Sequence, residues 1–294
     1  MRATALARAL RPHQWVKNVL LFLPLLMAHR TGDRAAWLAA LTAFACLSLA
    51  ASGVYVTNDL LDVESDRQHP TKKKRPFASG ELSMTTGLVL GPGLFVLAFV
   101  LAYLRLPLVF VGCLALYVLI STSYSLRLKR VMSLDVLVLA GLYALRIVAG
   151  GLATSIDVSP WLLAFSMFFF LSLAVLKRYT ELDRLQEAGA QLSQSRRGYK
   201  AMDMEVLRSV GPMSGYLAVL VFVLYINSDR VVSLYSQPDF LWLIAPLQLY
   251  WITRIWILAH RRQVDDDPIV FAVRDPVSYL VGLLVMLLAI LATR

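Results

Sequence analysis

Residues 58–80 read NDLLDVESDRQHPTKKKRPFASG and directly follow an apolar stretch that is long enough to cross a membrane. Asn58, Asp59, Asp62 and Asp66 recur at spacings of one, three and four residues. On a helix, such spacing places an amide and carboxylates on one face. Oxygen ligands of this kind suit a hard cation such as Mg²⁺, which usually shares its coordination shell with substrate phosphates and water. The stretch therefore predicts a metal site at a membrane surface.

A basic block, Lys72-Lys73-Lys74-Arg75, follows the acids within a few residues. On its own, such a block is typical of a loop on the positively charged inner side of a membrane. Beside acids that can hold a cation, the same side chains can bind phosphate oxygens. The combination favours an enzyme that handles a phosphorylated substrate next to a lipid. The alternative is a solvated helix end followed by a basic loop.

The composition is that of an all-α integral membrane protein. Of 294 residues, 58% are hydrophobic and 16% are charged, whereas soluble domains are about 25% charged. A spanning helix needs about 20 mostly apolar residues. We expect one domain over residues 1–294, containing a bundle of nine spans at residues 15–30, 36–57, 84–104, 107–124, 133–153, 160–177, 208–227, 239–259 and 275–293.

The distribution of Lys and Arg predicts the orientation of these spans. With the N-terminus in the cytoplasm, the inner segments contain 23 of the 29 basic residues and the outer segments contain 5. Basic residues concentrate in cytoplasmic loops, so this orientation is expected, and it brings the polar motifs to the cytoplasmic side. The net charge of +10 is then explained by topology, and no nucleic-acid partner is expected. No feature of the sequence indicates an oligomeric state.

A second polar group follows the fourth span and comprises Tyr124, Arg127, Lys129 and Arg130. Asp135 and Arg146 come next, eleven residues apart, which is close to three helical turns and places both on one side of the fifth span. Ionised groups within a span usually face a partner or a wet cavity. Because guanidinium binds phosphate oxygens in a bidentate manner, Arg146 is a candidate phosphate clamp. A purely structural pair of Arg146 with an aspartate is the alternative.

A third polar group, Lys177, Arg178, Glu181 and Asp183, follows the sixth span. Lys177 and Glu181 have the i, i+4 spacing of a local salt bridge. The inner segment 178–207 is long enough to cap a site. At the other end of the chain, Lys17 and Asn18 enter the first span and could face the same cavity as the acids.

Over nearly its whole length, the chain resembles the UbiA-type intramembrane prenyltransferase superfamily. The NDxxDxxxD motif of that superfamily is matched by Asn58, Asp59, Asp62 and Asp66. Its members are nine-helix bundles with a central cavity open to lipid and a cytoplasmic polar cap, and their motif binds a diphosphate through Mg²⁺. The resemblance implies the same fold here, with Asn58, Asp62 and Asp66 as metal ligands and with Asp59, Asp62 and Asp66 as catalytic residues.

Within the superfamily, the chain is most similar to the decaprenyl-phosphate phosphoribosyltransferase branch. That branch has RPxQWxKN near its start, matched over residues 11–18, and DRxHPxKxxRPxAxG, matched over residues 66–80. It also has a tyrosine followed by Leu-Lys and a later aspartate, matched by Tyr124, Leu128, Lys129 and Asp135. The resemblance implies transfer of a 5-phosphoribosyl group from phosphoribosyl diphosphate to a polyprenyl phosphate, in a bacterial inner membrane.

One departure from the wider superfamily bears on the substrate. Where users of polyprenyl diphosphates have a second acidic motif, DxxxD, this chain has KRYTE at residues 177–181. A metal site is lost and positive charge is gained, which suits a phosphate held directly by cations. An aromatic polyprenyltransferase that uses a polyprenyl diphosphate, and a lipid or anion transporter, are the alternatives. The expected substrate-binding residues are Lys17, Asn18, Arg67, Lys72, Arg75, Tyr124, Lys129, Asp135, Arg146, Lys177, Arg178 and Glu181.

Overall fold

A computed structural model describes residues 2–68, 71–187, 198–228, 231, 235–264 and 268–293. Within these ranges, every regular element is helical. His69, Pro70 and residues 188–197 of the expected cap lie outside the described part of the chain. The all-helical architecture confirms the expected fold class.

Eight helical segments in the described ranges are long and apolar enough to cross a membrane. They are α3 (Arg34–Leu61), α5 (Met84–Arg105), α6 (Leu108–Leu126), α7 (Leu134–Thr154), α8 (Pro160–Glu187), α9 (Asp203–Ile226), α11 (Asp239–Trp242) together with α12 (Ile244–His260), and α14 (Pro276–Thr293). Eight of the nine expected spans are thus found, and the protein is an integral membrane protein. The count of nine is not confirmed.

The first expected span, residues 15–30, takes a different form from the other eight. It consists of the 3₁₀ helix η1 (Pro12–Phe22) and the short helix α2 (Leu23–Met27). Arg11, just before η1, is in the left-handed conformation with φ of 53°. Pro12 and Pro24 lack the N–H group that a continuous α-helix would use. The chain therefore enters through a tighter, interrupted helix, although 3₁₀ runs of this length are uncommon.

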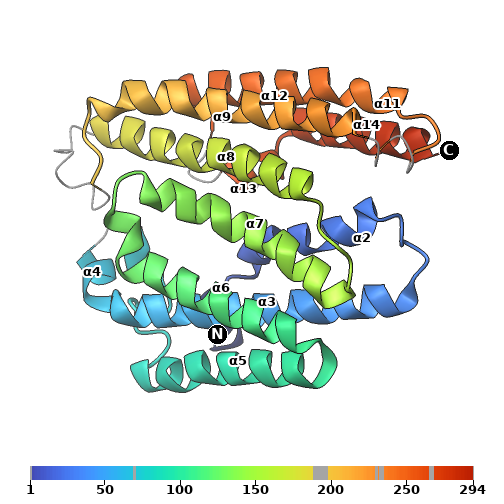
Figure 1. Ribbon diagram of the computed structural model, residues 1–294. Coiled ribbons are helices and arrows are strands. Elements are labelled where there is room, and N and C mark those ends of the chain that lie inside the picture. The colour runs from blue at the N-terminus through green and yellow to red at the C-terminus, as the bar shows by residue number, and fades with distance from the viewer. Residues whose placement is uncertain are drawn as a thin grey trace. The chain divides into compact units, whose positions relative to one another are not determined.

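Contacts divide the chain into two compact units, and the first comprises Met1–Arg127 and Leu145–Val158. It contains α1 (Arg2–Leu10), η1 to α3, α4 (Val63–Gln68), η2 (Lys72–Lys74), α5, α6 and the C-terminal part of α7. In Figure 1, α3 and α5 lie side by side. Ala5 and Ala9 of α1 are buried against Val63 and Phe77. Packing of α1 on this core brings the residue that follows it, Arg11, to the end of α3.

Gly150 of α7 allows a close backbone approach in the first unit. A Cβ atom added there would lie 1.9 Å from the carbonyl oxygen of Leu21 in η1. Because that distance is far below van der Waals contact, only glycine permits η1 to lie directly on α7.

The second unit comprises Leu128–Ala144 and Ser159–Arg294. It contains η3 (Leu128–Arg130), the N-terminal part of α7, α8, α9, α11, α12, α13 (Pro268–Ala272) and α14. The ring of Trp256 on α12 packs where a side chain at Gly211 of α9 would otherwise stand, and its Nε1 donates to Ser172 Oγ on α8 at 3.1 Å. These contacts bind three long helices into one core.

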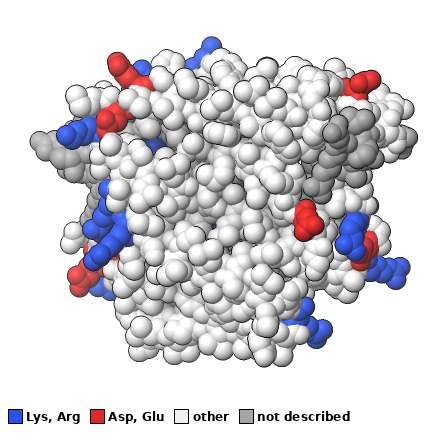
Figure 2. Space-filling model, viewed as in Figure 1, with Lys and Arg blue, Asp and Glu red and all other residues white. Residues whose placement is uncertain are grey.

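Each unit presents an apolar surface along the middle of its helices. On the face drawn in Figure 2, charged side chains lie near the helix ends of either unit. On α5, for example, Leu88, Val89, Val96 and Leu97 are exposed. Large exposed apolar surface is unusual for a soluble protein and is expected for helices that face lipid.

Candidate active site

The acid motif lies at the C-terminal end of α3, where the helix is interrupted. α3 ends at Leu61, and α4 begins at Val63. The hydrogen-bond spacing nevertheless continues through Asp62, because Asp62 N donates to Asn58 O at 3.0 Å and Asp66 N donates to Asp62 O at 2.8 Å. The expected single helix is therefore two helices with a continuous i, i+4 pattern, and the motif keeps its helical spacing.

The structure brings Asp59 and Asp66 together around one arginine. Arg75 Nη1 donates to Asp59 Oδ1 at 3.1 Å and to Asp66 Oδ2 at 2.6 Å. Arg11 Nη2 also donates to Asp59 Oδ1, at 2.6 Å, and its guanidinium lies 5.0 Å from the centre of the Tyr55 ring. Both carboxylates are buried. Buried charges persist only when they are paired and hydrogen-bonded, and the two arginines supply that pairing for both acids.

The loop after α4 presents Arg75 to the acids. Arg75 N donates to Lys72 O at 2.9 Å, and Ser79 N donates to Arg75 O at 2.8 Å. The buried ring of Phe77 anchors this turn in the core of the first unit. Arg67 Nε, from α4, donates to the carbonyl oxygen of Ala78 at 3.4 Å. The basic block is thus folded back onto the acid motif that precedes it.

Asn58 and Asp62 have different surroundings from the bridged pair. Asn58 Nδ2 donates to Ser125 Oγ on α6 at 2.7 Å. Because the amide nitrogen makes that bond, its oxygen is directed elsewhere and stays a possible ligand. Asp62 is partly buried and makes no side-chain hydrogen bond or ion pair within the described part of the chain. The acid that converges with Asp66 is therefore Asp59 and not Asp62.

The donor set at this point fits a divalent cation. In the described ranges, no group of three or more His, Cys, Asp or Glu side chains is arranged to hold a metal. Mg²⁺, however, is usually bound through one or two carboxylates, with phosphates and water completing its shell. Asp59 and Asp66 supply two carboxylates, and both accept a hydrogen bond from the same nitrogen of Arg75. Asp59 Oδ2 is buried without a hydrogen-bond partner, so this oxygen could ligate a cation.

Arg146 forms a separate buried cluster within the first unit. Its Nε donates to Asn18 Oδ1 at 2.9 Å, and its Nη2 donates to Tyr117 OH at 3.1 Å. Asn18 in turn donates to Ser48 Oγ at 3.0 Å. Asp135, which we expected on the same side of the fifth span, makes its hydrogen bonds to residues of the second unit.

Asp135 is the centre of a buried network in the second unit. Arg178 Nε donates to Asp135 Oδ2, and Arg178 Nη1 donates to Glu181 Oε2 at 2.5 Å. Tyr199 OH donates to Asp135 Oδ1 at 2.6 Å and accepts from Ser133 N at 3.1 Å. Burial and the bond to Asp135 raise the pKa of Tyr199, so its hydroxyl stays a donor. The network ties the end of segment 178–207 to the start of α7.

The other expected substrate-binding residues differ in exposure. Lys17, Tyr124, Lys129 and Lys177 are partly buried, whereas Arg67 and Lys72 are exposed. Three residues that hold the clusters together, Tyr55, Tyr117 and Arg11, were not among the expected site residues. Of these, only Arg11 carried a usable signal, since it opens the RPxQWxKN match at residues 11–18.

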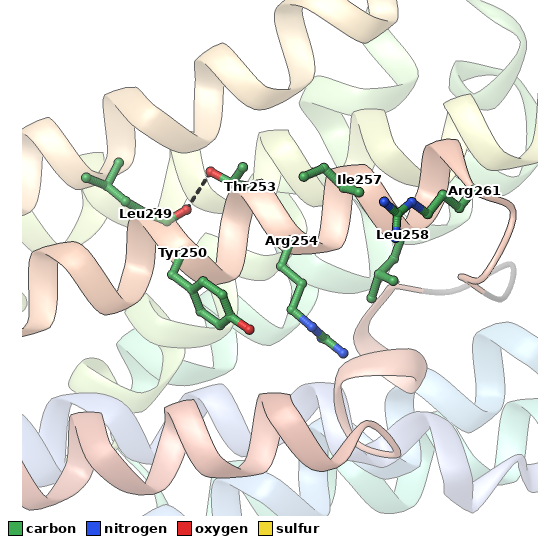
Figure 3. Close-up of a pocket in the computed structure, with 7 residues that line it drawn as sticks. All are labelled: Leu249, Tyr250, Thr253, Arg254, Ile257, Leu258 and Arg261. Atoms are coloured by element: carbon green, nitrogen blue, oxygen red, sulfur yellow. Dashed lines mark hydrogen bonds between the residues drawn. The ribbon is translucent and has the colours of Figure 1, made fainter.

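A cavity of about 530 Å³ lies along one face of α12 and contains none of the expected site residues. It is lined by Leu249, Tyr250, Thr253, Arg254, Ile257, Leu258 and Arg261 (Figure 3). Arg254 binds Asp275 through two hydrogen bonds, at 2.7 and 2.9 Å. The charge of Arg254 is thereby matched within the protein.

Comparison with known sequences places these clusters in context. A profile of the UbiA prenyltransferase family matches residues 18–277. An uncharacterized protein, y4nM of Sinorhizobium fredii, is 38% identical over 94% of this chain, and the chain spans 53% of its length. Nodulation protein NoeC of Azorhizobium caulinodans is 38% identical over 91% of this chain and 86% of its own. Decaprenyl-phosphate phosphoribosyltransferase of Mycobacterium tuberculosis is 37% identical over 74% of this chain and 72% of its own.

Solved structures show the same fold at low sequence identity. A UbiA homologue from Archaeoglobus fulgidus, bound to GPP and Mg²⁺, has a TM-score of 0.66 and 17% identity over 97% of this chain and 96% of that chain. A structure of digeranylgeranylglyceryl phosphate synthase has a TM-score of 0.66 and 15% identity over 99% of this chain and 98% of that chain.

Proposed function

Because the chain belongs to the UbiA prenyltransferase family of membrane transferases, we propose that it transfers a 5-phosphoribosyl group from phosphoribosyl diphosphate to a polyprenyl phosphate. The observation that carries this proposal is the convergence of two buried carboxylates, Asp59 and Asp66, on one cationic nitrogen beside a basic loop. That arrangement suits a diphosphate bound with a divalent cation. Similarity to decaprenyl-phosphate phosphoribosyltransferases supports the choice of donor and acceptor.

The residues of the first unit would bind the leaving diphosphate. Asp59 and Asp66 would hold Mg²⁺, with the Asn58 oxygen and Asp62 as further ligands. When bound, Mg²⁺ supplies Lewis-acid neutralisation of the diphosphate. Arg75, Lys72 and Arg67 lie on or beside the loop that follows the acids, and they would bind phosphate oxygens of the donor.

A polyprenyl phosphate is already ionised near neutral pH, so the acceptor needs no strong general base. Its phosphate oxygen would bond to C1 of the ribose while the C1–O bond to diphosphate breaks, and diphosphate would leave with the electron pair. Catalysis would then come from positioning and from electrostatic stabilisation.

For the lipid phosphate, the candidates are Lys129 and Lys177 of the second unit, and Arg146 of the first unit is a separate candidate. Arg178, adjacent to Lys177, is fully buried and bound to Asp135 and Glu181. We therefore assign Arg178, Asp135 and Glu181 a positioning role, in which their ion pairs fix the part of α8 that carries Lys177. Tyr124 and Asn18 would act as neutral hydrogen-bonding groups.

We place the reaction on the cytoplasmic side of a bacterial inner membrane, within one catalytic domain. The bias of Lys and Arg towards the segments that contain the acid motif supports this orientation. Phosphoribosyl diphosphate is a soluble cytoplasmic compound in this scheme, and the lipid phosphate comes from the membrane.

The direct test is an assay of the purified protein with radiolabelled phosphoribosyl diphosphate and several polyprenyl phosphates, with and without Mg²⁺. We expect a radiolabelled lipid that requires Mg²⁺. Asp59→Asn and Asp66→Asn should each lower turnover by at least about a hundredfold. Each variant removes a charged ligand of the metal ion, and the metal ion supplies several kcal/mol of charge stabilisation. Glu64→Gln, which removes an exposed acid of α4, is the matched control and should retain activity. Prenylation of an aromatic acceptor from a polyprenyl diphosphate, with no use of phosphoribosyl diphosphate, would reject the proposal.

A further inference from the structure

The guanidinium of Arg75 is more exposed than the two acids that it joins, and it is carried by a loop rather than by a helix. Asp59 and Asp66 are each 2% exposed and lie on helices α3 and α4. The Arg75 side chain is 27% exposed and extends from the loop after η2. Rotation of this long side chain would carry the guanidinium out to solvent, whereas the acids have short side chains on buried helical positions. The cation is therefore the exchangeable member of the cluster.

The two acids depend on Arg75 to different degrees. Asp59 has a second cation, because Arg11 Nη2 also donates to its Oδ1 at 2.6 Å. For the Asp66 side chain, Arg75 is the one hydrogen-bonding or ionic partner within the described part of the chain. A buried carboxylate without a compensating charge is strongly unfavourable. If Arg75 left, Asp66 would require another cation in its place.

We propose that Arg75 is a resident counter-cation, which holds Asp59 and Asp66 together in the metal-free protein and moves to the substrate diphosphate when a divalent cation takes its place. A metal ion bound to the same carboxylate oxygens would lie within a few ångströms of the guanidinium, and repulsion between the two positive charges would disfavour their simultaneous binding. Once displaced, the guanidinium has a matched partner in a diphosphate, to which it can donate two parallel hydrogen bonds. The identity of that phosphate group rests on the proposed function, but the exchange at the acids does not.

This exchange makes Arg75 act in opposite directions on two ligands. It competes with a bare metal ion, and it assists the complex of that metal with diphosphate. A residue that only stabilises the fold would not lower the affinity for the bare metal ion and raise the affinity for its diphosphate complex. A residue that only binds phosphate would leave the affinity for the bare metal unchanged.

The test measures binding of Mn²⁺, as a paramagnetic substitute for Mg²⁺, to the purified full chain by electron paramagnetic resonance. Arg75→Gln should bind Mn²⁺ about tenfold more tightly than the wild-type protein, because a competing charge is removed. The preformed complex of Mn²⁺ with inorganic diphosphate should bind Arg75→Gln at least about tenfold more weakly. Arg8→Gln removes the same charge from an exposed pair with Glu81 in the same unit and should change neither affinity.

Thermal unfolding gives a second measurement if Arg75→Gln is poorly stable. Mn²⁺ should raise the melting temperature of Arg75→Gln more than that of the wild-type protein, because at a given concentration a ligand that binds the folded state more tightly stabilises it more. An unchanged or weaker Mn²⁺ affinity in Arg75→Gln would overturn the inference, and so would an absence of Mn²⁺ binding to both proteins. Failure of phosphoribosyl transfer alone, with the opposed affinities intact, would reject the proposed function and leave the exchange standing.

Discussion

Removal of the Asp135 carboxylate should lower the free energy of unfolding, because Asp135 holds a buried network together and we assign it an orienting role rather than a contact with substrate. Asp135 is fully buried, and its partner Arg178 is 1% exposed. In Asp135→Ala, the Arg178 guanidinium loses this partner and keeps its ion pair with Glu181, whose side chain is 35% exposed and therefore partly screened by water. Breaking a buried ion pair by removing one partner typically costs about 3–5 kcal/mol, because the other charge is left buried.

The hydroxyl of Tyr199 adds a second loss in the same variant. It donates to Asp135 Oδ1, and an unsatisfied buried donor costs about 1–3 kcal/mol. Since Glu181 recovers part of the lost attraction for Arg178, we expect a net decrease of about 4 kcal/mol in the free energy of unfolding. The decrease would be measured by reversible unfolding in mixed micelles. Glu205→Ala, which removes an exposed acid from α9, is the control and should stay within about 0.5 kcal/mol of wild type.

A double variant separates the structural role from a substrate role. Asp135→Leu combined with Arg178→Met removes both charges at once, and it should be far less destabilising than Asp135→Ala, because replacing a whole buried pair with apolar groups is often neutral. If Asp135→Ala costs less than about 1 kcal/mol while turnover collapses, the pair is not structural. Arg178 would then be a phosphate ligand, as the sequence had suggested.

Three further predictions concern the fold, the acceptor and the topology. Gly150→Ala should cost at least about 1–3 kcal/mol of stability, because its Cβ would overlap a backbone oxygen of η1; Gly141→Ala on the same helix has open space and should be neutral in the same unfolding measurement. Lys177→Ala should raise the KM for polyprenyl phosphate while leaving the affinity for Mg²⁺–phosphoribosyl diphosphate nearly unchanged, and equal effects on both would contradict its assignment to the lipid. Reporter tags at residues 31–34 should be external and tags at 70–74 cytoplasmic; reporter activity on the opposite sides would reverse the predicted orientation.

Local properties of the chain were sufficient to predict the helices and the acid motif. Apolar runs of about 20 residues have few alternatives to a spanning helix, because backbone polar groups in lipid must be satisfied within the segment. Eight of the expected spans follow from this rule. The spacing within residues 58–66 is likewise a property of one stretch of backbone, and its i, i+4 hydrogen bonds persist through the break at Asp62.

Partnerships between distant residues depended on packing and could not be read from spacing. Helical spacing places both Asp59 and Asp62 on the same face as Asp66. Asp59 nevertheless shares Arg75 with Asp66, because the loop that carries Arg75 folds back onto that side. Arg178 lies 43 residues from Asp135, and Tyr199 lies 64 residues from it. Such pairs form only where helices bring them together, since the free energy of an ion pair depends on distance and burial rather than on residue type. Sequence periodicity thus predicts which residues share a face, whereas tertiary contacts decide which charges neutralise one another and which stay available to a ligand.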